Sequence, residues 1–454
     1  MQKYLLPICL IGLVLVAATF VTLEGGPAAL LLTTVLALIA AGIFRHFTDQ
    51  KRVVTSLFLV ALLFRLAFGL FVHIYDLREF FGGDANTYDF LGNELLLRWT
   101  DAVLTPNPTV EFALQNIASA WGMYHLVAGI YYLVGRNILA AQSVCGVIGA
   151  AIAPMVYFCA ITLFGNRKVA VRSALLVAVF PAFVIWSGQL LKDGPIVFLL
   201  VFAMTMILKL QERFSVGALL SLAAGILGIM SLRFYVFYML LAAIAASLVI
   251  GVSTSAKAVA RNAVIILGLG LVLTYIGVSR NATSAFERFA NLSVVENSRS
   301  DLATAGSGFG ADIDVSTTEG AISAVPIGLA YLYLAPFPWE VSSLRSGITV
   351  PEVIVWWAML PLMVMGILWS MREHFRKAFP IIVFALLLSL AYSIFQGNVG
   401  TAYRQRTQIQ VFGFIFVAVG WTLREEKREN KRVLAAARRG SFSIRDQGRR
   451  EQAA

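Results

Sequence analysis

Three short segments contain the ionisable side chains that stand out in this sequence. The first is Gly82-Gly83-Asp84-Ala85-Asn86-Thr87-Tyr88, in which two glycines allow a sharp turn before the aspartate. Asp84 is then expected close to the bilayer surface, where its carboxylate can accept hydrogen bonds or a proton. The alternative makes Asp84 the N-cap of a helix, since aspartate is a preferred capping residue, with Thr87 helping to start that helix.

The second segment, Trp186 to Gly194, contains an adjacent lysine and aspartate, Lys192 and Asp193. It is predicted to be the tight outer turn between two membrane spans, so both side chains lie at the edge of the hydrocarbon. Ionisable groups at that depth are costly and usually face a cavity or one another. We therefore treat Lys192 and Asp193 as candidate site residues. The alternatives are a local salt bridge or a helix cap formed by Asp193.

The third segment, Gln396 to Arg406, contains Arg404 and Arg406. The predicted topology places both arginines outside the membrane, on the side that the positive-inside rule disfavours, so topology does not account for them. Guanidinium groups match phosphate and carboxylate oxygens through paired hydrogen bonds. We assign both arginines to phosphate binding, with Arg233 as a weaker companion at the end of another span. The alternative is pairing with acids of the outer loops.

The elements that must position these residues are membrane helices. Hydrophobic residues make up 59% of the 454 residues, and mean hydropathy is +0.79. Only 13% of residues are charged, about half the fraction typical of soluble proteins. The net charge of +11 does not indicate nucleic acid binding, because the basic residues lie in short loops and a tail, as topogenic charges do. The three cysteines lie in apolar runs and lack metal-binding spacing.

Apolar runs of about 20 residues, the length needed to cross a bilayer, recur along the chain. The sequence predicts an all-α, polytopic membrane protein with one membrane domain, 1–423, and a basic tail, 424–454. The first run has no small-x-small cleavage site and is expected to remain as an uncleaved span. The twelve predicted spans are 4–22, 27–44, 53–75, 138–164, 169–187, 194–210, 216–232, 234–252, 261–279, 352–371, 379–396 and 408–423.

A further apolar segment, 117–134, decides the topology. If it crossed the membrane, several basic loops would face outward, against the positive-inside rule. If it lies as a helix in the outer interface, which suits its Trp and Tyr residues, every basic loop faces the cytoplasm. Both termini are then cytoplasmic. The loops on that side are Arg45–Arg52, Arg167–Lys168, Lys209–Arg213, Lys257–Arg261 and Arg372–Lys377.

Two long segments are expected outside the membrane, 76–137 with its interfacial helices and 280–350. Residues 76–116 of the first segment include seven acids and two bases, a net charge of −5. The tail from Arg424 onward contains ten bases and five acids, a net charge of +5, which suits the surface of anionic cytoplasmic lipid. A partner-binding tail is the alternative.

Residues 55–210 resemble the glycosyltransferase-C superfamily, membrane enzymes that include protein O-mannosyltransferases and bacterial aminoarabinose transferases. The matching features are Asp84 and Tyr88 in an Asp-x-x-x-Tyr loop, an interfacial helix, a Tyr-rich helix ending at Gly135, and a Pro181-containing span leading to Leu191-Lys192-Asp193. The resemblance implies that Asp84 is the catalytic base and that Asp193 belongs to the donor site. The segment with Arg404 and Arg406 also resembles outer loops of polysaccharide polymerases and O-antigen ligases.

The resemblance implies transfer of a sugar from a polyprenyl-phosphate donor to a glycan or lipid acceptor on the extracytoplasmic face. Asp84 would take the acceptor proton, and Lys192, Arg404 and Arg406 would stabilise the leaving lipid phosphate. Asn86 and Tyr88 are assigned supporting roles. No nucleotide cofactor is required, and a divalent cation is compatible with the scheme although no cluster demands one. The expected setting is cell-envelope polysaccharide synthesis in the bacterial inner membrane.

Three other functions stay open. A polymerase or ligase of lipid-linked glycans would use similar groups. A transporter or flippase would place ionisable residues in the middle of spans and would contain repeated, broken helices. Arg65 is the clear mid-span charge, and no inverted repeat is visible. A scaffold of an envelope-polymer machine would need neither Asp84 nor Arg404.

Overall fold

The computed structural model describes residues 2–102, 107–115, 120–250, 256–275, 291–304, 306–341 and 343–451. Within these ranges every regular element is helical, and the only strand-like pairing is one bridge between Gly308 and Asn398. The prediction of an all-α fold is confirmed.

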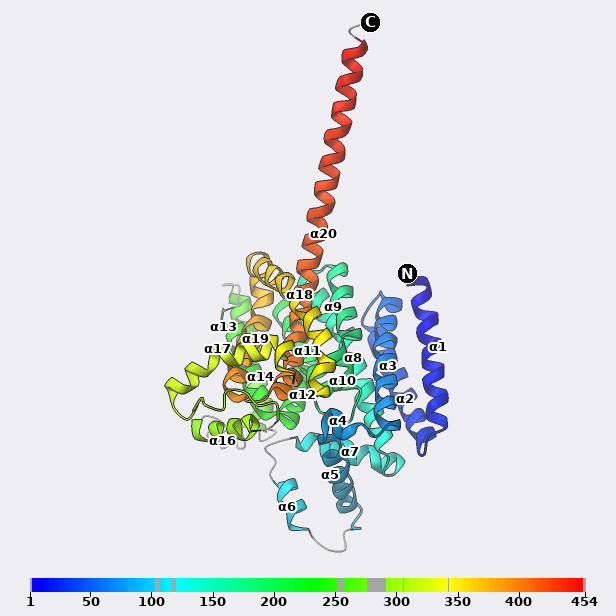
Figure 1. Ribbon diagram of the computed structural model, residues 1–454, viewed down its shortest axis with the longest axis vertical. Coiled ribbons are helices and arrows are strands. Elements are labelled where there is room, and N and C mark those ends of the chain that lie inside the picture. Colours follow the sequence, from blue (N-terminus) through cyan, green and yellow to red (C-terminus); the bar gives the residue numbers. More distant parts are fainter. Residues whose placement is uncertain are drawn as a thin grey trace.

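The longer helices form a bundle, with shorter helices between them (Figure 1). The bundle comprises α1 (Gln2–Val21), α2 (Gly26–His46), α3 (Lys51–Ile74), α8 (Ile138–Phe164), α9 (Arg167–Val179), α10 (Pro181–Ser187), α11 (Asp193–Glu212), α12 (Val216–Leu232), α13 (Phe234–Ile250), α14 (Ala256–Tyr275), α18 (Leu344–Glu373), α19 (Phe375–Phe395) and α20 (Val399–Glu451). The others are α4 (Arg78–Gly82), α5 (Asp84–Trp99), α6 (Pro108–Gln115), α7 (Trp121–Val134), α16 (Leu292–Ala303), α17 (Thr318–Leu334) and the 3-10 turn η1 (Pro338–Glu340).

Seven described helices are long and apolar enough to cross a membrane, and eight if the bent pair α9 and α10 counts as one span. They support an integral membrane protein. The runs predicted at 4–22, 216–232 and 234–252 do form helices, but their described apolar parts are shorter than a span. The run 408–423 lies inside α20, and the last residues of 261–279 fall outside the described part of the chain. The count of twelve spans therefore stays a prediction.

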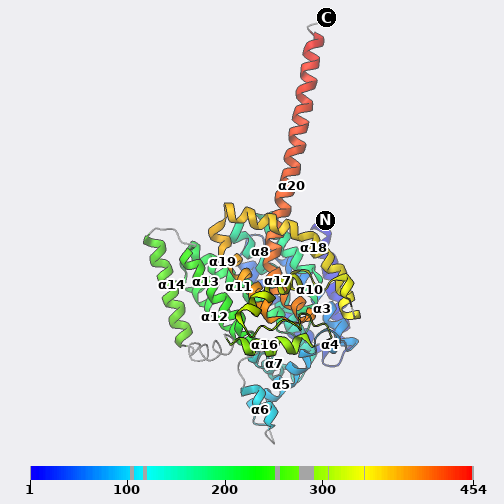
Figure 2. The same cartoon turned by 60° about the vertical axis from the view of Figure 1, so that its left-hand side comes forward.

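The two ends of the bundle differ. Helix α1 begins and α20 leaves the bundle at one end, whereas α4, α5, α6, α7 and α16 lie toward the other (Figures 1 and 2). Helix α7 has 14 residues, a length of about 21 Å, and packs against α5. A hydrocarbon core is about 30 Å thick, so α7 is too short to cross it upright. Its placement in the interface stays a prediction.

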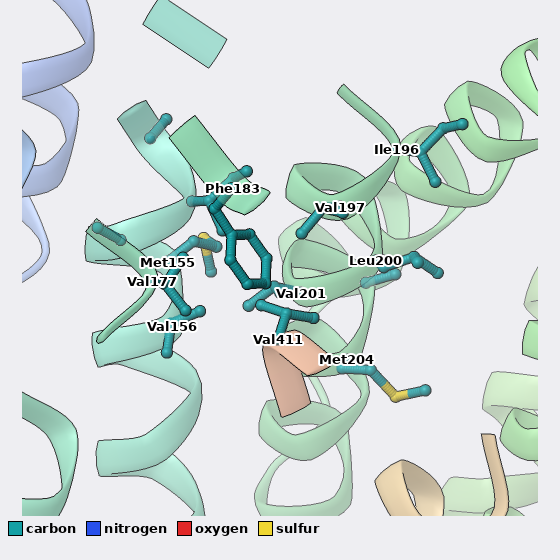
Figure 3. Packing of buried hydrophobic residues seen from close by; sticks show 14 of the residues in the cluster. Met155, Val156, Val177, Phe183, Ile196, Val197, Leu200, Val201, Met204 and Val411 are labelled. Atoms are coloured by element: carbon teal, nitrogen blue, oxygen red, sulfur yellow. The ribbon is translucent and has the colours of Figure 1, made fainter. Parts of the chain in front are cut away.

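The centre of the bundle is a dense apolar contact between α8, α9, α10, α11 and α20. Figure 3 shows Met155 of α8, Val177 of α9, Phe183 of α10, Val201 of α11 and Val411 of α20 packed together. In a bilayer, van der Waals packing of this kind is a main source of helix association, because lipid tails are as apolar as the side chains. The contact joins α10 and α11 to the part of α20 around Val411.

The break between α9 and α10 is a bend of 57° at Pro181. Proline has no N–H group, so the carbonyl of Val177 loses its usual helical donor. Arg65 of α3, which is fully buried, replaces it. The Arg65 guanidinium donates to Val177 O at 3.2 Å, to Ala178 O at 3.1 Å and to Ser187 Oγ at 2.7 Å. The mid-span charge therefore has a structural role in holding a broken helix.

Two glycines allow the segment before α11 to pack closely against α8. A β-carbon at Gly149 of α8 would lie 2.5 Å from Ser187 Cβ, and one at Gly194 would lie 2.7 Å from it. Both distances are shorter than real contacts, so glycine is required at each position for this packing. The close fit places Lys192 and Asp193 at the start of α11.

Candidate functional site

Arg404 links two carboxylates from different parts of the chain. Its Nη1 donates to Asp84 Oδ2 at 2.7 Å, and its Nε donates to Asp193 Oδ2 at 2.5 Å. Asp193 is 1% exposed, whereas the Asp84 side chain is 49% exposed. Asp84 is therefore the carboxylate that a substrate can reach, and Asp193 is the inner anchor of Arg404.

Two further cations complete what we call the charge cluster, defined as Asp84, Lys192, Asp193, Arg233 and Arg404. Arg233 lies in the turn between α12 and α13, and its Nη2 is 3.3 Å from Asp193 Oδ1. Lys192 directly precedes α11. Burial, followed by the positive charge of Arg233, lowers the pKa of Lys192 to about 8. Four separate segments of the chain thus meet at the end of the bundle where α5 begins.

The charge cluster has more positive than negative charge. Three cations face two carboxylates, and Arg345 of α18 lies within electrostatic range of Asp84 and Arg404. Arg233 Nη1 and Arg404 Nη2 are buried and have no hydrogen-bond partner among the described residues. Buried guanidinium groups with open donors and excess positive charge are suited to binding an anion such as phosphate.

Neither aspartate caps its helix. Asp84 and Asp193 are the first residues of α5 and α11, so the N-cap positions are Gly83 and Lys192, and neither helix has a side-chain capping hydrogen bond. Their recorded partners are arginines. Both carboxylates still lie in a first helical turn, where the helix dipole favours negative charge. The cap interpretation of Asp84 and Asp193 is therefore wrong, and the expected local salt bridge is replaced by long-range pairs.

Tyr88 lies one turn after Asp84 on α5 and is buried beside the charge cluster. Burial raises the pKa of the Tyr88 phenol, and the Asp84 carboxylate raises it further. The phenol is therefore a proton-bearing hydrogen-bond donor. Asn86 is placed differently, since it is exposed and its Nδ2 donates to Glu79 Oε1. The structure brings Tyr88 to the site but not Asn86.

Arg404 and Arg406 point to different places because they lie on a helix. Successive helical residues are about 100° apart around the helix axis, so Arg404 and Arg406, two positions apart, lie on nearly opposite faces. Arg406 is 2% exposed, its Nη1 donates to Tyr333 O at 3.0 Å, and its guanidinium stacks on Tyr403. It thus satisfies a carbonyl in the last turn of α17. Among the described residues no hydrogen bond or ion pair joins Arg406 to the charge cluster.

Several polar residues near the charge cluster were not among the sequence predictions. Arg345 was missed, as was Glu352 of α18, which accepts from the Tyr403 hydroxyl at 2.6 Å. Gln408 and Gln410 are buried in α20, with side-chain atoms that lack partners in the described structure. A signal was present, because the run Arg404–Gln410 is strongly polar at the start of an apolar helix.

Metal ligands are not evident at this site. Both of its carboxylates contact guanidinium groups, and the described residues contain no group of three His, Cys, Asp or Glu side chains placed to hold an ion. Any divalent cation would have to displace an arginine from a carboxylate. The compatibility with a divalent cation therefore stays a prediction.

Comparison of the chain with protein-family models, with curated proteins and with solved structures gives no match. The functional argument therefore depends on the geometry of the charge cluster.

Proposed function

We propose that this protein is a membrane glycosyltransferase that uses a sugar carried on a polyprenyl phosphate. The observation that carries the proposal is the position of Arg404 between an accessible carboxylate, Asp84, and a buried one, Asp193. Asp84 can accept a proton, and the cations that Asp193 anchors, Arg404 and Arg233, can bind a phosphate. The site lies at the end of the bundle opposite both termini, which under the predicted topology is the extracytoplasmic face.

The proposed reaction is a displacement at the anomeric carbon. A hydroxyl oxygen of the acceptor attacks that carbon, and its proton passes to Asp84. The bond between the anomeric carbon and the phosphate oxygen breaks, and the lipid phosphate leaves with the electron pair. The transition state resembles an oxocarbenium ion, as in glycoside hydrolysis. Arg404, Arg233 and Lys192 stabilise the charge that develops on the leaving phosphate.

A hollow at the start of α20 is the proposed place for the acceptor. It has a volume of about 360 Å³ and is lined by Phe309, Tyr331, Phe337 and Glu340, among others. Val399, the first residue of α20, also lines it, and Arg404 lies about 7.5 Å further along that helix. Aromatic faces with a few polar groups are typical of small-molecule sites, and a carboxylate such as Glu340 can accept hydrogen bonds from hydroxyl groups.

The transporter alternative has less support. It predicts ionisable groups that are available in the middle of spans. Arg65 is such a residue, but its described hydrogen bonds go to carbonyls at the α9 break, to Ser187 and to the carbonyl of Ala61 in its own helix. Its position is therefore explained by helix geometry, without a transported ion.

The proposal is tested by phosphate-lipid binding. The purified protein in detergent is titrated with undecaprenyl phosphate and with the uncharged polyprenol of equal length, and binding is followed by native mass spectrometry. The phosphate should bind at least about tenfold more tightly, because charge-assisted hydrogen bonds contribute about 1.5–3 kcal/mol. Arg404→Gln should remove most of this preference.

The controls separate binding from folding. Removing Arg404 alone leaves the buried Asp193 with one fewer partner, which can destabilise the fold. The double variant Arg404→Gln/Asp193→Asn removes both charges and should restore stability without restoring the preference. The variant Arg372→Gln changes an arginine at the end of α18 that is remote from Arg345. This variant should bind both lipids as the unaltered protein does. A folded Arg404→Gln protein that keeps the full phosphate preference would overturn the proposal.

A further inference from the structure

A second feature of the bundle lies away from the charge cluster. An apolar groove with a volume of about 1010 Å³ runs between α2 and α12, with α8 and α11 forming its floor. Leu36 and Ile43 of α2, Ala151 of α8, Phe202 of α11 and Ala218 of α12 line it. Its volume is at the upper end of the range of about 300–1,000 Å³ seen for ligand pockets. The groove is large enough for a lipid chain.

The groove is shorter than the bilayer is thick. On α11 it extends from Phe198 to Glu212, a rise of about 21 Å, which is less than the hydrocarbon thickness of about 30 Å, so the groove does not cross the bilayer and opens toward one leaflet. It lies toward the end of α11 that is remote from the charge cluster, since Asp193 and Lys209 are about 24 Å apart along that helix. The occupant therefore enters from the leaflet opposite the charge cluster.

The mouth of the groove is positively charged. Lys209 and Arg213 line it, and both are exposed. Lys209 lies over the ring of Phe47, and neither base forms an ion pair with a described residue. The acid at the mouth, Glu212, is paired with Lys377. Two cations are thus available at the depth of the lipid headgroups.

We infer that this groove binds an anionic phospholipid of the leaflet that contains the basic loops. Its acyl chains fill the apolar groove, and its phosphate and headgroup contact Lys209 and Arg213. The length of the groove favours this occupant over a polyprenyl carrier, whose much longer chain would extend past the end of the groove. The bound lipid fills the space between α2 and α12 and so stabilises the bundle. This inference is independent of the proposed sugar transfer.

The experiment compares two phospholipids with identical acyl chains, phosphatidylglycerol and phosphatidylethanolamine. Native mass spectrometry of the delipidated full-length protein should show about tenfold tighter retention of phosphatidylglycerol, the effect expected of two nearby cations. Added phosphatidylglycerol should also raise the unfolding temperature more than phosphatidylethanolamine does, because it binds the folded state.

Two variants and one control test the position of the lipid. Lys209→Ala/Arg213→Ala should remove the preference between the lipids but leave weak retention of both. Ala40→Phe, which fills the groove from α2, should reduce retention of both lipids. Arg372→Ala/Arg376→Ala removes two exposed bases that do not line the groove, and should behave like the unaltered protein.

Three outcomes would overturn the inference. The first is equal retention of the two lipids by the unaltered protein. The second is a preference that survives in Lys209→Ala/Arg213→Ala. The third is displacement of phosphatidylglycerol by undecaprenyl phosphate with loss of carrier binding in Ala40→Phe, which would assign the groove to the carrier lipid.

Discussion

The guanidinium of Arg404 contacts one carboxylate that solvent reaches and one that it does not. This difference assigns the two acids different tasks. Asp193 is held from two sides, by Arg404 and by Arg233, and is 1% exposed, so it is suited to keeping the cations in place. Asp84 has a single guanidinium partner and open access, which is what a proton acceptor requires.

Asp84→Asn should abolish sugar transfer while the protein folds normally. The amide oxygen can still accept the hydrogen bond from Arg404, but the amide cannot take a proton, and a general base contributes about 10²–10⁴-fold to the rate. Transfer is measured with membranes containing the labelled lipid-linked donor, and folding by thermal unfolding. Asp84→Glu should keep measurable activity. A fully active Asp84→Asn protein would remove Asp84 from the mechanism.

Under the proposed function, Lys192 should make phosphate binding dependent on pH. Burial and the neighbouring Arg233 lower its pKa to about 8, so its positive charge is lost as pH rises through that value. Above pH 8 most Lys192 side chains are neutral, so phosphate binding requires that Lys192 take up a proton. Affinity for undecaprenyl phosphate should therefore fall by up to about tenfold per pH unit. Lys192→Arg should flatten the profile, since arginine stays charged. An unchanged slope in Lys192→Arg would exclude this role.

The same shift affects stability in the opposite direction. Between pH 8 and the ordinary pKa of lysine near 10.5, the unfolded chain binds a proton that the folded protein does not. Stability therefore gains from Lys192 as pH rises through this window, while ligand binding loses. Lipid affinity and unfolding temperature, both measured on one sample across this pH range, separate loss of binding from unfolding.

At the scale of elements, the broken helix α9–α10 depends on a residue from another helix. Arg65→Met should lower the unfolding temperature strongly, because two buried carbonyls and a hydroxyl lose their donor, at about 1–3 kcal/mol each. Pro181→Ala supplies a backbone N–H for the carbonyl of Val177. The loss caused by Arg65→Met should therefore be smaller in a Pro181→Ala background than in the unaltered protein. Equal losses in both backgrounds would contradict this explanation of the buried charge.

At the scale of the whole molecule, α1 begins and α20 leaves the bundle at one end, and α5, whose first residue is Asp84, lies toward the other (Figure 1). The predicted topology makes the first end cytoplasmic. In intact cells, a membrane-impermeant maleimide should label Trp99→Cys but should label Lys168→Cys only after permeabilisation. The background should be low, because Cys9, Cys145 and Cys159 are buried. Labelling of Lys168→Cys in intact cells would reverse the orientation and with it the assignment of the site to the outer face.

The sequence by itself determined the class of protein, the approximate positions of its helices and four of the five residues of the charge cluster as leading candidates. These features are local. A long apolar run predicts a membrane helix whatever it packs against, and a charged residue at the edge of such a run is conspicuous because its burial is costly. Lys192, Asp193 and Arg404 meet that description, and Arg233 does so more weakly. Asp84 was singled out by the Gly82-Gly83 turn that precedes it.

Only the tertiary structure decided which of these residues act together. Arg404 and Arg406 were equivalent in the sequence, but α20 begins at Val399, so the helical phase directs Arg404 to the two aspartates and Arg406 to the carbonyl of Tyr333. Arg65 was the mid-span charge that a transporter would use. In the structure it donates to the carbonyl of Val177 at the helix break before Pro181. Pairing between distant segments depends on helix start, rotation and packing, which no single apolar run or charged residue encodes by itself.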